Sequence, residues 1–419
     1  MKITICAYDA PNNIDGPTTW IKRLLPFLRE NGVETRLIFI AGKRKDLSTL
    51  SYFQKLNFAC KLIPAELFFE EQVRAILSDI HTHPPDVFIP NYFPVACYAN
   101  QWINSTEIPS VLILHNDDDR HHSLVDEFVV GEPKKQVSAV VTVSKSMHRK
   151  VELKQPLNTK VICIPYGAPL TKTLSQFSAD KNLKLMYLGR LNEVQKRISD
   201  VAKGFCKIVK TVPDTEAVIY GKGPSLSSVL SIIQQEGKGF PVHYGGTLPV
   251  SEVQNYLAAN HVFVLLSNFE GIPIALMEAM ACGLVPICSD IESGIPEIIT
   301  HGKNGFIIKD RDDELVKTVQ LLREQPKVWQ KLSKAARATI ENGYSEETNN
   351  KKWLHLFQEL AVTKRRTKDF VIPPIEVLQK EKYKPDLLSN ETLIPSQIMI
   401  PALRFKKFIG RIKRTYIKS

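Results

Sequence analysis

The sequence lacks the features that mark membrane-spanning or disulfide-stabilised proteins. No apolar run reaches the roughly 20 residues that cross a bilayer as a helix. Residues 1–8 have too short an apolar stretch for a signal peptide and are predicted to form a strand. The seven cysteines are scattered and include no Cys-x-x-Cys, which argues against structural zinc and is typical of a reducing compartment. We therefore expect a cytoplasmic protein.

Charge bias is also missing from most of the chain. The net charge is +11, but residues 361–419 hold 14 Lys/Arg and 5 Asp/Glu, a net of +9, which leaves only +2 for the rest. A nearly neutral body gives no reason to expect nucleic-acid binding by the whole protein. The basic character belongs to a C-terminal tail, residues 361–419.

The end of that tail, residues 401–419, contains seven Lys/Arg and no acidic residue, and its apolar residues recur at helical spacing. These are Phe405, Phe408, Ile409, Ile412 and Tyr416. A basic amphipathic helix suits an anionic membrane surface, so one hypothesis is peripheral attachment to the cytoplasmic face of a membrane. A helix packed on the protein itself and a disordered tail remain open alternatives, and Gly410 weakens the helical pattern.

Short apolar strands that alternate with helical segments are plentiful. Strands are expected at 2–8, 34–41, 86–90, 110–115, 139–144 and 160–165, and, after a break, at 183–188, 216–220, 241–244, 261–267, 285–289 and 305–309. Runs rich in Val, Ile and Leu are typical of parallel strands covered on both faces. The pattern predicts the α/β class, with two facing Rossmann-like, doubly wound parallel-sheet domains.

The break in this rhythm divides the chain. We expect a first domain over 1–168, a linker over 169–182 and a second domain over 183–345. A terminal helix over 346–360 is a candidate to cross back to the first domain. Ligands of such sheets bind outside the carboxyl ends of the strands, so two facing domains would enclose a shared cleft.

The most informative segment is a strand, a tight turn and a helix that place two carboxylates eight residues apart. Glu270 lies in the turn, and Glu278 lies in the predicted helix 274–282, which Pro273 is suited to begin as its first residue. The free N–H groups at a helix start attract phosphate or sugar hydroxyls. Glu278 is embedded in apolar residues and needs a partner, because burying a lone charge is costly. The alternative interpretation is a capping Glu270 and a solvated Glu278.

Two loops at strand ends in the second domain add cations and glycines. Gly189 lets the chain turn closely, and Arg190 and Lys196 could neutralise a diphosphate, although surface charge is the alternative for each. Gly221 and Gly223 form a turn that could let a base or ribose approach the backbone, or that is only a turn.

The first domain offers two further candidates. Gly16 lies in the loop after the first strand and could present N–H groups to phosphate. His115 ends the fourth strand and could hydrogen-bond a sugar hydroxyl, act as a base, or be a structural histidine. The run Asp117–Asp119 is an alternative metal site. We do not favour it, because Arg190 and Lys196 already offer positive charge, and no metal is predicted.

Together, these motifs resemble those of the nucleotide-sugar glycosyltransferases of family 4. The resemblance rests on Glu270-x7-Glu278, on Gly189-Arg190 with Lys196, and on Gly221-x-Gly223-Pro224, and it is strongest over 183–310. It implies the GT-B fold, retention of anomeric configuration, and no divalent metal or other cofactor.

The resemblance also implies a role for each residue. The catalytic set would be Glu270, His115, Arg190 and Lys196. The donor site would be formed by Gly16, Gly189, Arg190, Lys196, Gly221, Gly223, Glu270, Gly271, Ile272, Pro273, Ile274 and Glu278. Arg190 and Lys196 would hold the diphosphate, Glu278 the ribose hydroxyls, and Glu270 with the backbone after it the transferred sugar. The leaving phosphate would accept the proton of the acceptor, so that catalysis is positioning plus charge stabilisation.

The sequence thus predicts an enzyme, a retaining hexosyltransferase. It would move a hexose-like sugar from a nucleoside-diphosphate sugar to a glycan or lipid-linked acceptor, in the synthesis of cell-surface polysaccharide or glycolipid. One rival is a nucleotide-sugar epimerase or a phosphorolytic enzyme of the same fold. Another rival is a non-catalytic module whose tail attaches it to a membrane.

Overall fold

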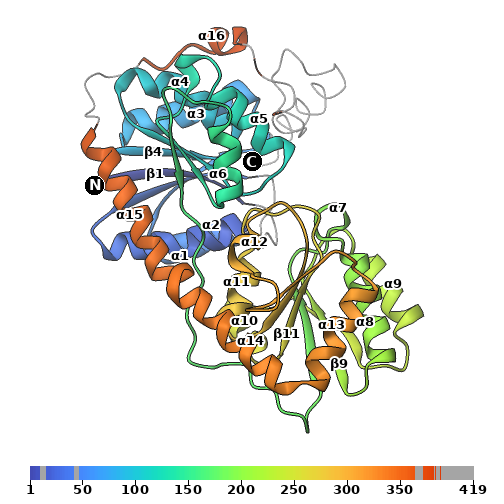
Figure 1. Ribbon diagram of the computed structural model, residues 1–419. Coiled ribbons are helices and arrows are strands. Elements are labelled where there is room, and N and C mark those ends of the chain that lie inside the picture. The colour runs from blue at the N-terminus through green and yellow to red at the C-terminus, as the bar shows by residue number, and fades with distance from the viewer. Residues whose placement is uncertain (10–15, 42–46, 364–370, 382, 384–386, 388–419) are drawn as a thin grey trace.

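Two parallel β-sheets organise the chain, one in each domain (Figure 1). The computed structural model describes residues 1–9, 16–41, 47–363, 371–381, 383 and 387. The first sheet has seven strands in the order β3-β2-β1-β4-β5-β6-β7, and the second has six in the order β10-β9-β8-β11-β12-β13. Neighbouring strands are parallel throughout. The predicted fold of two doubly wound α/β domains is therefore confirmed.

The strands form where short apolar runs allow burial on both faces. In the first sheet they are β1 Lys2–Asp9, β2 Glu34–Ala41, β3 Ala59–Pro64, β4 Val87–Asn91, β5 Ser110–Leu114, β6 Ala139–Thr142 and β7 Lys160–Cys163. In the second they are β8 Leu183–Leu188, β9 Thr215–Tyr220, β10 Val242–Gly246, β11 Val262–Leu265, β12 Val285–Ser289 and β13 Phe306–Ile308. Strands β4, β5, β6, β11 and β12 are buried along their whole length, as expected for parallel strands under helices.

Helices connect the strands and cover both faces of each sheet (Figure 1). They are α1 Gly16–Glu30, α2 Ser48–Lys55, α3 Phe69–Thr82, α4 Pro94–Ile103, α5 Asp119–Phe128, α6 Lys145–Glu152, α7 Glu193–Lys196, α8 Ile198–Thr211, α9 Leu226–Glu236, α10 Val253–Ala258, α11 Ile274–Ala281, α12 Ile295–Ile298, α13 Asp313–Glu324, α14 Pro326–Thr339, α15 Glu346–Thr363 and α16 Ile375–Lys380. Helix α1 forms because its sequence is amphipathic. Its buried residues recur at helical spacing, and its other face carries Lys22 and Arg29.

The strand order reverses beside β1 in the first sheet and beside β8 in the second. In the first sheet β1 lies between β2 and β4, and in the second β8 lies between β9 and β11. Loops after these strands diverge to opposite sides of the sheet and leave a crevice at the carboxyl ends. The segments that follow β1, β4, β8 and β11 are therefore the ones placed to bind a ligand.

Within the residues that the structure describes, the chain crosses between the domains near Ala168 and again near Ser345, and the two crossings lie side by side. Ala168 forms a parallel bridge with Ser345, and a Cβ on Gly167 would lie 2.4 Å from Cα of Glu346. Helix α15 then runs back along the first domain (Figure 1), where the rings of Trp353 and Trp20 are 4.9 Å apart. This aromatic contact fixes the end of the chain's main body on the first domain.

A further segment packs on the outer side of the first domain. Helix α16 lies there (Figure 1), and Leu378 is fully buried. The ring of Tyr383 is 4.7 Å from Phe69 and 4.8 Å from Tyr98. The tail segment 401–419 lies outside the described residues. Among the helices of the described residues, none is long and apolar enough to cross a membrane.

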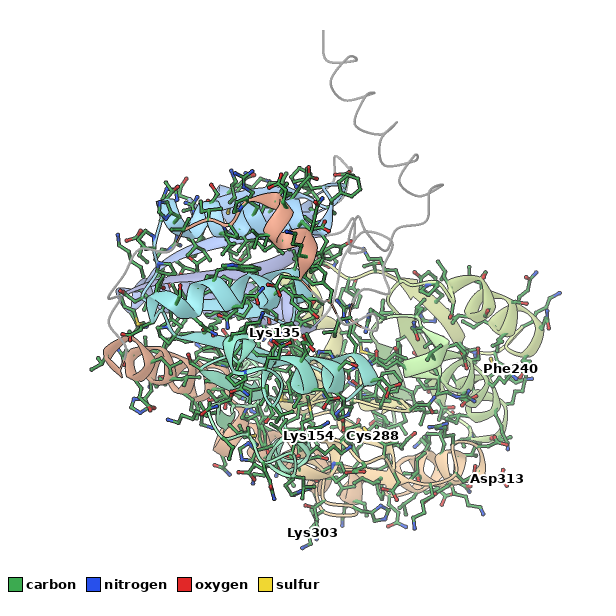
Figure 2. The ribbon with its side chains drawn as sticks, turned by 90° about the horizontal axis from the view of Figure 1, so that it is seen from above. Lys135, Lys154, Phe240, Cys288, Lys303 and Asp313 are labelled. Carbon is green, nitrogen blue, oxygen red and sulfur yellow. The ribbon has the colours of Figure 1, made fainter. Side chains whose placement is uncertain are left out.

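Several buried charges in the described part are paired, which offsets their desolvation. Lys135, which Figure 2 labels in the first domain, is nearly fully buried, and its Nζ lies 2.7 Å from Glu127 and 3.0 Å from Glu132. All seven cysteines are free thiols.

Candidate active site

A cavity of about 610 Å³ lies between the two domains at the carboxyl ends of both sheets. Every residue that the sequence singled out for the site lines it. These are Gly16 and His115 from the first domain, and Gly189, Arg190, Lys196, Gly221, Gly223, Glu270, Gly271, Ile272, Pro273, Ile274 and Glu278 from the second. They converge because the loops after β1, β5, β8, β9 and β11 all open toward the same crevice.

Glu270 is a buried carboxylate in the loop between β11 and α11. It is 4% exposed, its Oε1 accepts a hydrogen bond of 2.6 Å from the Ser267 hydroxyl, and Nζ of Lys196 lies 2.5 Å from the same oxygen. The ion pair offsets the cost of burying both charges. Glu270 is thereby held in one orientation at the start of α11, with a cation beside it.

Gln195 joins Arg190 to this pair, and the sequence reasoning missed it. Nη2 of Arg190 donates to Oε1 of Gln195 at 2.8 Å, while Nε2 of Gln195 donates to the carbonyl of Phe269 at 3.3 Å and lies 3.5 Å from Oε2 of Glu270. One sequence signal was available, because the Asn192 side chain caps the start of α7 by accepting from the N–H of Gln195. A capped turn between two cations indicates a built loop rather than mobile surface charge.

Two glycines are required by close backbone approach. Gly221 has a φ of +138°, and a Cβ there would lie 1.8 Å from the carbonyl oxygen of Gly189. A Cβ on Gly223 would lie 2.3 Å from the carbonyl oxygen of Leu191. The two loops also exchange backbone hydrogen bonds, from Gly189 to Tyr220 and from Leu191 to Lys222. Because these glycines allow the backbones to pack so closely, the loops after β8 and β9 form one continuous wall of the cavity.

Two helices begin at the cavity. Gly16 at the start of α1 lies opposite Ile274 at the start of α11, and a Cβ on Gly16 would be 3.6 Å from Cδ1 of Ile274. Helix α11 begins at Ile274, as predicted, and Pro273 is its N-cap rather than its first residue. The partial positive charges of both helix ends add to those of the two cations. This corner of the cavity is suited to an anion.

Glu278 has the partner that its apolar surroundings demanded, and that partner comes from the other domain. Nη2 of Arg23 on α1 donates to Oε1 of Glu278, and the two side chains are 17% and 10% exposed. Nε of Arg23 also lies 3.6 Å from Oε2 of Glu346. The sequence indicated that a partner was needed but not which cation supplies it.

Both ring nitrogens of His115 have hydrogen-bond partners. The Asn91 amide donates to the carbonyl of Cys6, so its Oδ1 faces Nε2 of His115, 2.6 Å away, and that nitrogen carries the hydrogen. Nδ1 then accepts from the Tyr166 hydroxyl. Burial lowers the pKa of His115 well below the usual range, so the ring is neutral. This geometry favours the structural interpretation over the role of base, and a contact of His115 with the donor sugar stays a prediction.

The first-domain wall also carries aromatic and charged groups. The ring of Tyr92 stacks with His121 at 5.9 Å and meets His115 edge-on at 4.9 Å, and Arg120 lines the same wall. Asp118 accepts from Nδ1 of His121 at 2.7 Å; burial raises the pKa of this carboxyl, but the hydrogen bonds from His121 outweigh burial and lower it.

The run Asp117–Asp119 does not converge on one point. Asp117 pairs with Lys150 at 2.8 Å and with His122 at 2.9 Å, away from the Asp118–His121 pair. Within the part of the chain that the structure describes, no group of three or more His, Cys, Asp or Glu is arranged to hold a metal ion. The metal alternative therefore has no support from this run, and a metal-free reaction stays a prediction.

Solved structures share the architecture. One is S. aureus TarM, a mutant form in complex with Fondaparinux, alpha-GlcNAc-glycerol and UDP, with a TM-score of 0.69 and 12% identity over 85% of this chain and 99% of that one. Another is Anabaena HepE in complex with UDP and glucose, with a TM-score of 0.67 and 16% identity over 86% of this chain and 100% of that one. The fold is of the GT-B type.

Sequence comparison finds a family match that lies mostly in the second domain. Residues 173–339 match the family model of glycosyl transferases group 1. N-acetyl-alpha-D-glucosaminyl L-malate synthase of Bacillus anthracis is 29% identical over 181 residues, 42% of this chain and 46% of that protein. The amylovoran biosynthesis glycosyltransferase AmsK of Erwinia amylovora is 30% identical over 187 residues, 43% of this chain and 45% of that protein. The chain thus spans about half the length of these curated relatives, and the family model matches residues that lie mostly in the second domain.

Proposed function

We propose that this protein is a retaining glycosyltransferase. It moves a hexose-like sugar from a nucleoside-diphosphate sugar to a glycan or lipid-linked acceptor, in the synthesis of cell-surface polysaccharide or glycolipid. The observation that carries the proposal is the Glu270–Lys196 pair with Arg190 beside it, at a helix start within the interdomain cavity. The match of residues 173–339 and the similarity to an amylovoran biosynthesis enzyme support it.

In this proposal the second domain holds the donor. The diphosphate lies among Arg190, Lys196 and the start of α11, because fixed cations and free N–H groups there meet its charge. The ribose hydroxyls bind Glu278, and the sugar lies against Glu270 and the backbone of 271–274. The UDP-bound neighbours of the same fold support a nucleotide in this cavity.

The chemistry proposed is front-face transfer without a protein nucleophile. Among the described residues that line the cavity, the carboxylates are Asp118, Glu270 and Glu278, and each is engaged by a basic side chain. These contacts already occupy each carboxylate, which supports transfer without a protein nucleophile. The leaving phosphate therefore accepts the proton of the acceptor hydroxyl, and Arg190 and Lys196 stabilise the negative charge that develops on it.

Product analysis tests this proposal. The protein is incubated with UDP-glucose labelled in the sugar, with and without glycan acceptors, and the products are separated and their anomeric configuration is read by NMR. We expect label in an α-linked product only when an acceptor is present. An isomerised donor without acceptor would show an epimerase, and a sugar phosphate formed with inorganic phosphate would show phosphorolysis. A β-linked product would contradict retention.

We further propose that the basic tail holds the enzyme, a cytoplasmic protein, on an anionic membrane. Support comes from the sequence of 401–419 and from the packing of α16 and Tyr383, which belong to the same basic tail, on the first domain. Each Lys or Arg near such a surface contributes about 1 kcal/mol. Sedimentation with phosphatidylglycerol vesicles, against phosphatidylcholine vesicles, compares the full chain with a chain that ends at residue 400. Equal binding of the two chains would contradict this part.

A further inference from the structure

Arg23 connects the first domain to a carboxylate that lines the candidate donor site in the second. Its guanidinium donates to Oε1 of Glu278, a residue that lines the cavity, whereas Arg23 itself does not line it. The pair spans 255 positions of the sequence and joins α1 to α11. Glu278 is therefore held by a group that no part of its own domain supplies.

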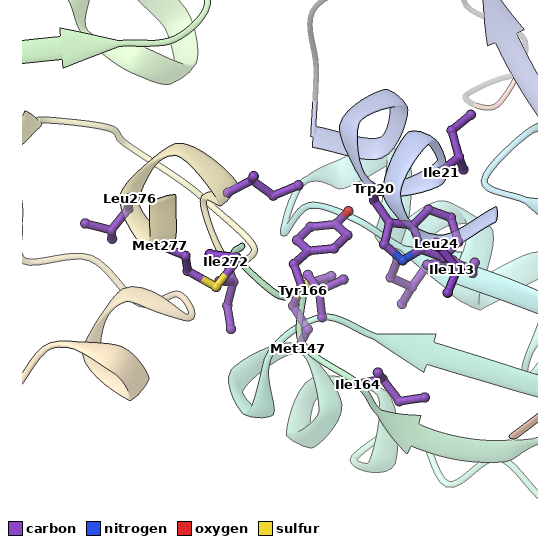
Figure 3. Packing of buried hydrophobic residues seen from close by; sticks show 14 of the residues in the cluster. Trp20, Ile21, Leu24, Ile113, Met147, Ile164, Tyr166, Ile272, Leu276 and Met277 are labelled. Carbon is purple, nitrogen blue, oxygen red and sulfur yellow. The ribbon is translucent and has the colours of Figure 1, made fainter. Parts of the chain in front are cut away.

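The helix that carries Arg23 is rigidly placed. Trp20, one turn earlier on α1, is 4% exposed, and its ring lies 5.6 Å from His115 and 4.9 Å from Trp353. Figure 3 shows Tyr166 between Trp20 and Ile272 of the second domain, so the same cluster reaches across the interface. Because this cluster holds α1 beside the second domain, the position of Arg23 relative to Glu278 depends on how the two domains are placed.

Arg23 also separates two carboxylates. Glu278 and Glu346 both face its guanidinium, and Glu346 is the first residue of the crossing helix α15. Burial raises the pKa of Glu346, the charge of Arg23 lowers it, and the charge of Glu278 raises it. Without Arg23 the two carboxylates would repel each other in a partly buried space, and Glu278 would lose its fixed orientation.

We infer that Arg23 is a positioning residue of the donor site, which holds one oxygen of Glu278 so that the other meets the ribose hydroxyls. This inference rests on the proposed function, in which Glu278 binds the ribose. It makes nucleotide affinity depend on a first-domain residue that does not touch the nucleotide.

A double-mutant cycle tests the inference. The probe is UDP, and calorimetry gives its Kd for the wild-type chain, Arg23→Gln, Glu278→Gln and the double variant. We expect Arg23→Gln to weaken UDP binding about tenfold, since a hydrogen bond to a charged group is lost, and to change nothing further in the Glu278→Gln background. Arg23→Lys, which keeps the charge, is expected to recover part of the affinity.

Two matched controls separate positioning from general stability. Glu346→Gln removes the other partner of Arg23, and Arg29→Gln changes an exposed arginine of the same helix that binds the carbonyl of Leu56 and lies over the ring of Phe58. Both are expected to keep the UDP affinity within about twofold. Melting temperatures show whether each variant is folded. If Arg23→Gln does not fold, Arg23→Lys replaces it in the double-mutant cycle.

The outcomes are distinct. Unchanged or tighter UDP binding in Arg23→Gln would overturn the inference, and so would an equal loss in both backgrounds. If the wild-type chain binds neither UDP nor ADP, GDP, CDP or dTDP, the proposed function fails, and the inference fails with it. If the wild-type chain binds the nucleotide but Arg23 and Glu278 show no coupling, the inference is wrong and the proposed function stands.

Discussion

Nζ of Lys196 lies 2.5 Å from Oε1 of Glu270, although the two residues are 74 positions apart. They meet because β8 and β11 are neighbours in the second sheet, and each residue comes from the segment after one of these strands. The pair is internal to the second domain and keeps the cation in one place. A cation held in place before the reaction needs no reorganisation when charge develops on the leaving group.

The two cations are expected to dominate turnover. Arg190→Ala and Lys196→Ala should each lower kcat by about 10²–10³-fold, the scale of losing one donor to a developing negative charge. Initial rates with labelled UDP-glucose and acceptor measure the effect. Lys203→Ala, an exposed lysine on α8, is the matched control and should keep the wild-type rate. Wild-type rates in both site variants would refute the assigned diphosphate site.

Gly221 is expected to be intolerant of any side chain. Gly221→Ala should reduce the free energy of unfolding by about 3 kcal/mol, because it combines a strained φ with a clash against the backbone of Gly189. Gly239 has a φ of +84° and nothing within 4 Å of a Cβ, so Gly239→Ala should cost only about 1 kcal/mol. Thermal unfolding ranks the two variants. A Gly221→Ala chain that is as stable as Gly239→Ala would show that the loops can separate.

Acid should destabilise the second domain through His261. Its Nδ1 accepts from the N–H of Lys184, its Nε2 donates to the carbonyl of Gln176, and burial lowers its pKa to about 4. The unfolded chain takes up the proton at a pKa near 6.5, so the folded state is the poorer proton acceptor. Stability is then complete above about pH 7, falls as the pH drops from 6.5 to 4, and loses about 3 kcal/mol in all.

Melting temperatures across this pH range measure the effect. His261→Asn removes the titrating group, so its melting temperature should fall less with acid than that of the wild-type chain. His115, whose pKa burial also lowers, titrates in both chains and cancels in the comparison. Identical pH profiles would show that His261 does not carry the acid sensitivity.

Removal of divalent metal should leave the reaction unchanged. In the proposed site Arg190, Lys196 and two helix starts neutralise the diphosphate, and Asp117 and Asp118 are engaged by Lys150 and His121. Turnover with EDTA is expected to equal turnover without it. Loss of activity that magnesium restores would show that the metal-free assignment is wrong.

The two-sheet fold could be predicted from the sequence because strands and helices are determined largely by local residue patterns. Parallel strands buried on both faces must be short apolar runs, and glycines and charges after such strands must gather at one edge. Strand β3 escaped prediction because it is an edge strand with Ala59, Lys61 and Leu62 exposed, so its apolar signal is weak. The candidate site could be placed because its residues follow strands.

Partners across the cleft could not be predicted, because they depend on how the domains face each other. The sequence has 55 Lys and Arg residues, and nothing local selects Arg23 for Glu278. Likewise, no pattern tells that Asn91 and Tyr166 occupy both nitrogens of His115. The predicted tail helix over 401–419 lies outside the described residues and stays a prediction.

The most direct test of the central claim is a thermal-shift panel of nucleoside diphosphates and their sugars on the full chain. A ligand at about 100 times its Kd stabilises the native state by about 2.7 kcal/mol, which is readily seen as a higher melting temperature. The account predicts a shift with at least one nucleotide, and a much smaller shift in Arg190→Ala and Lys196→Ala. No shift with any of them at millimolar concentration, with both side chains intact, would contradict it.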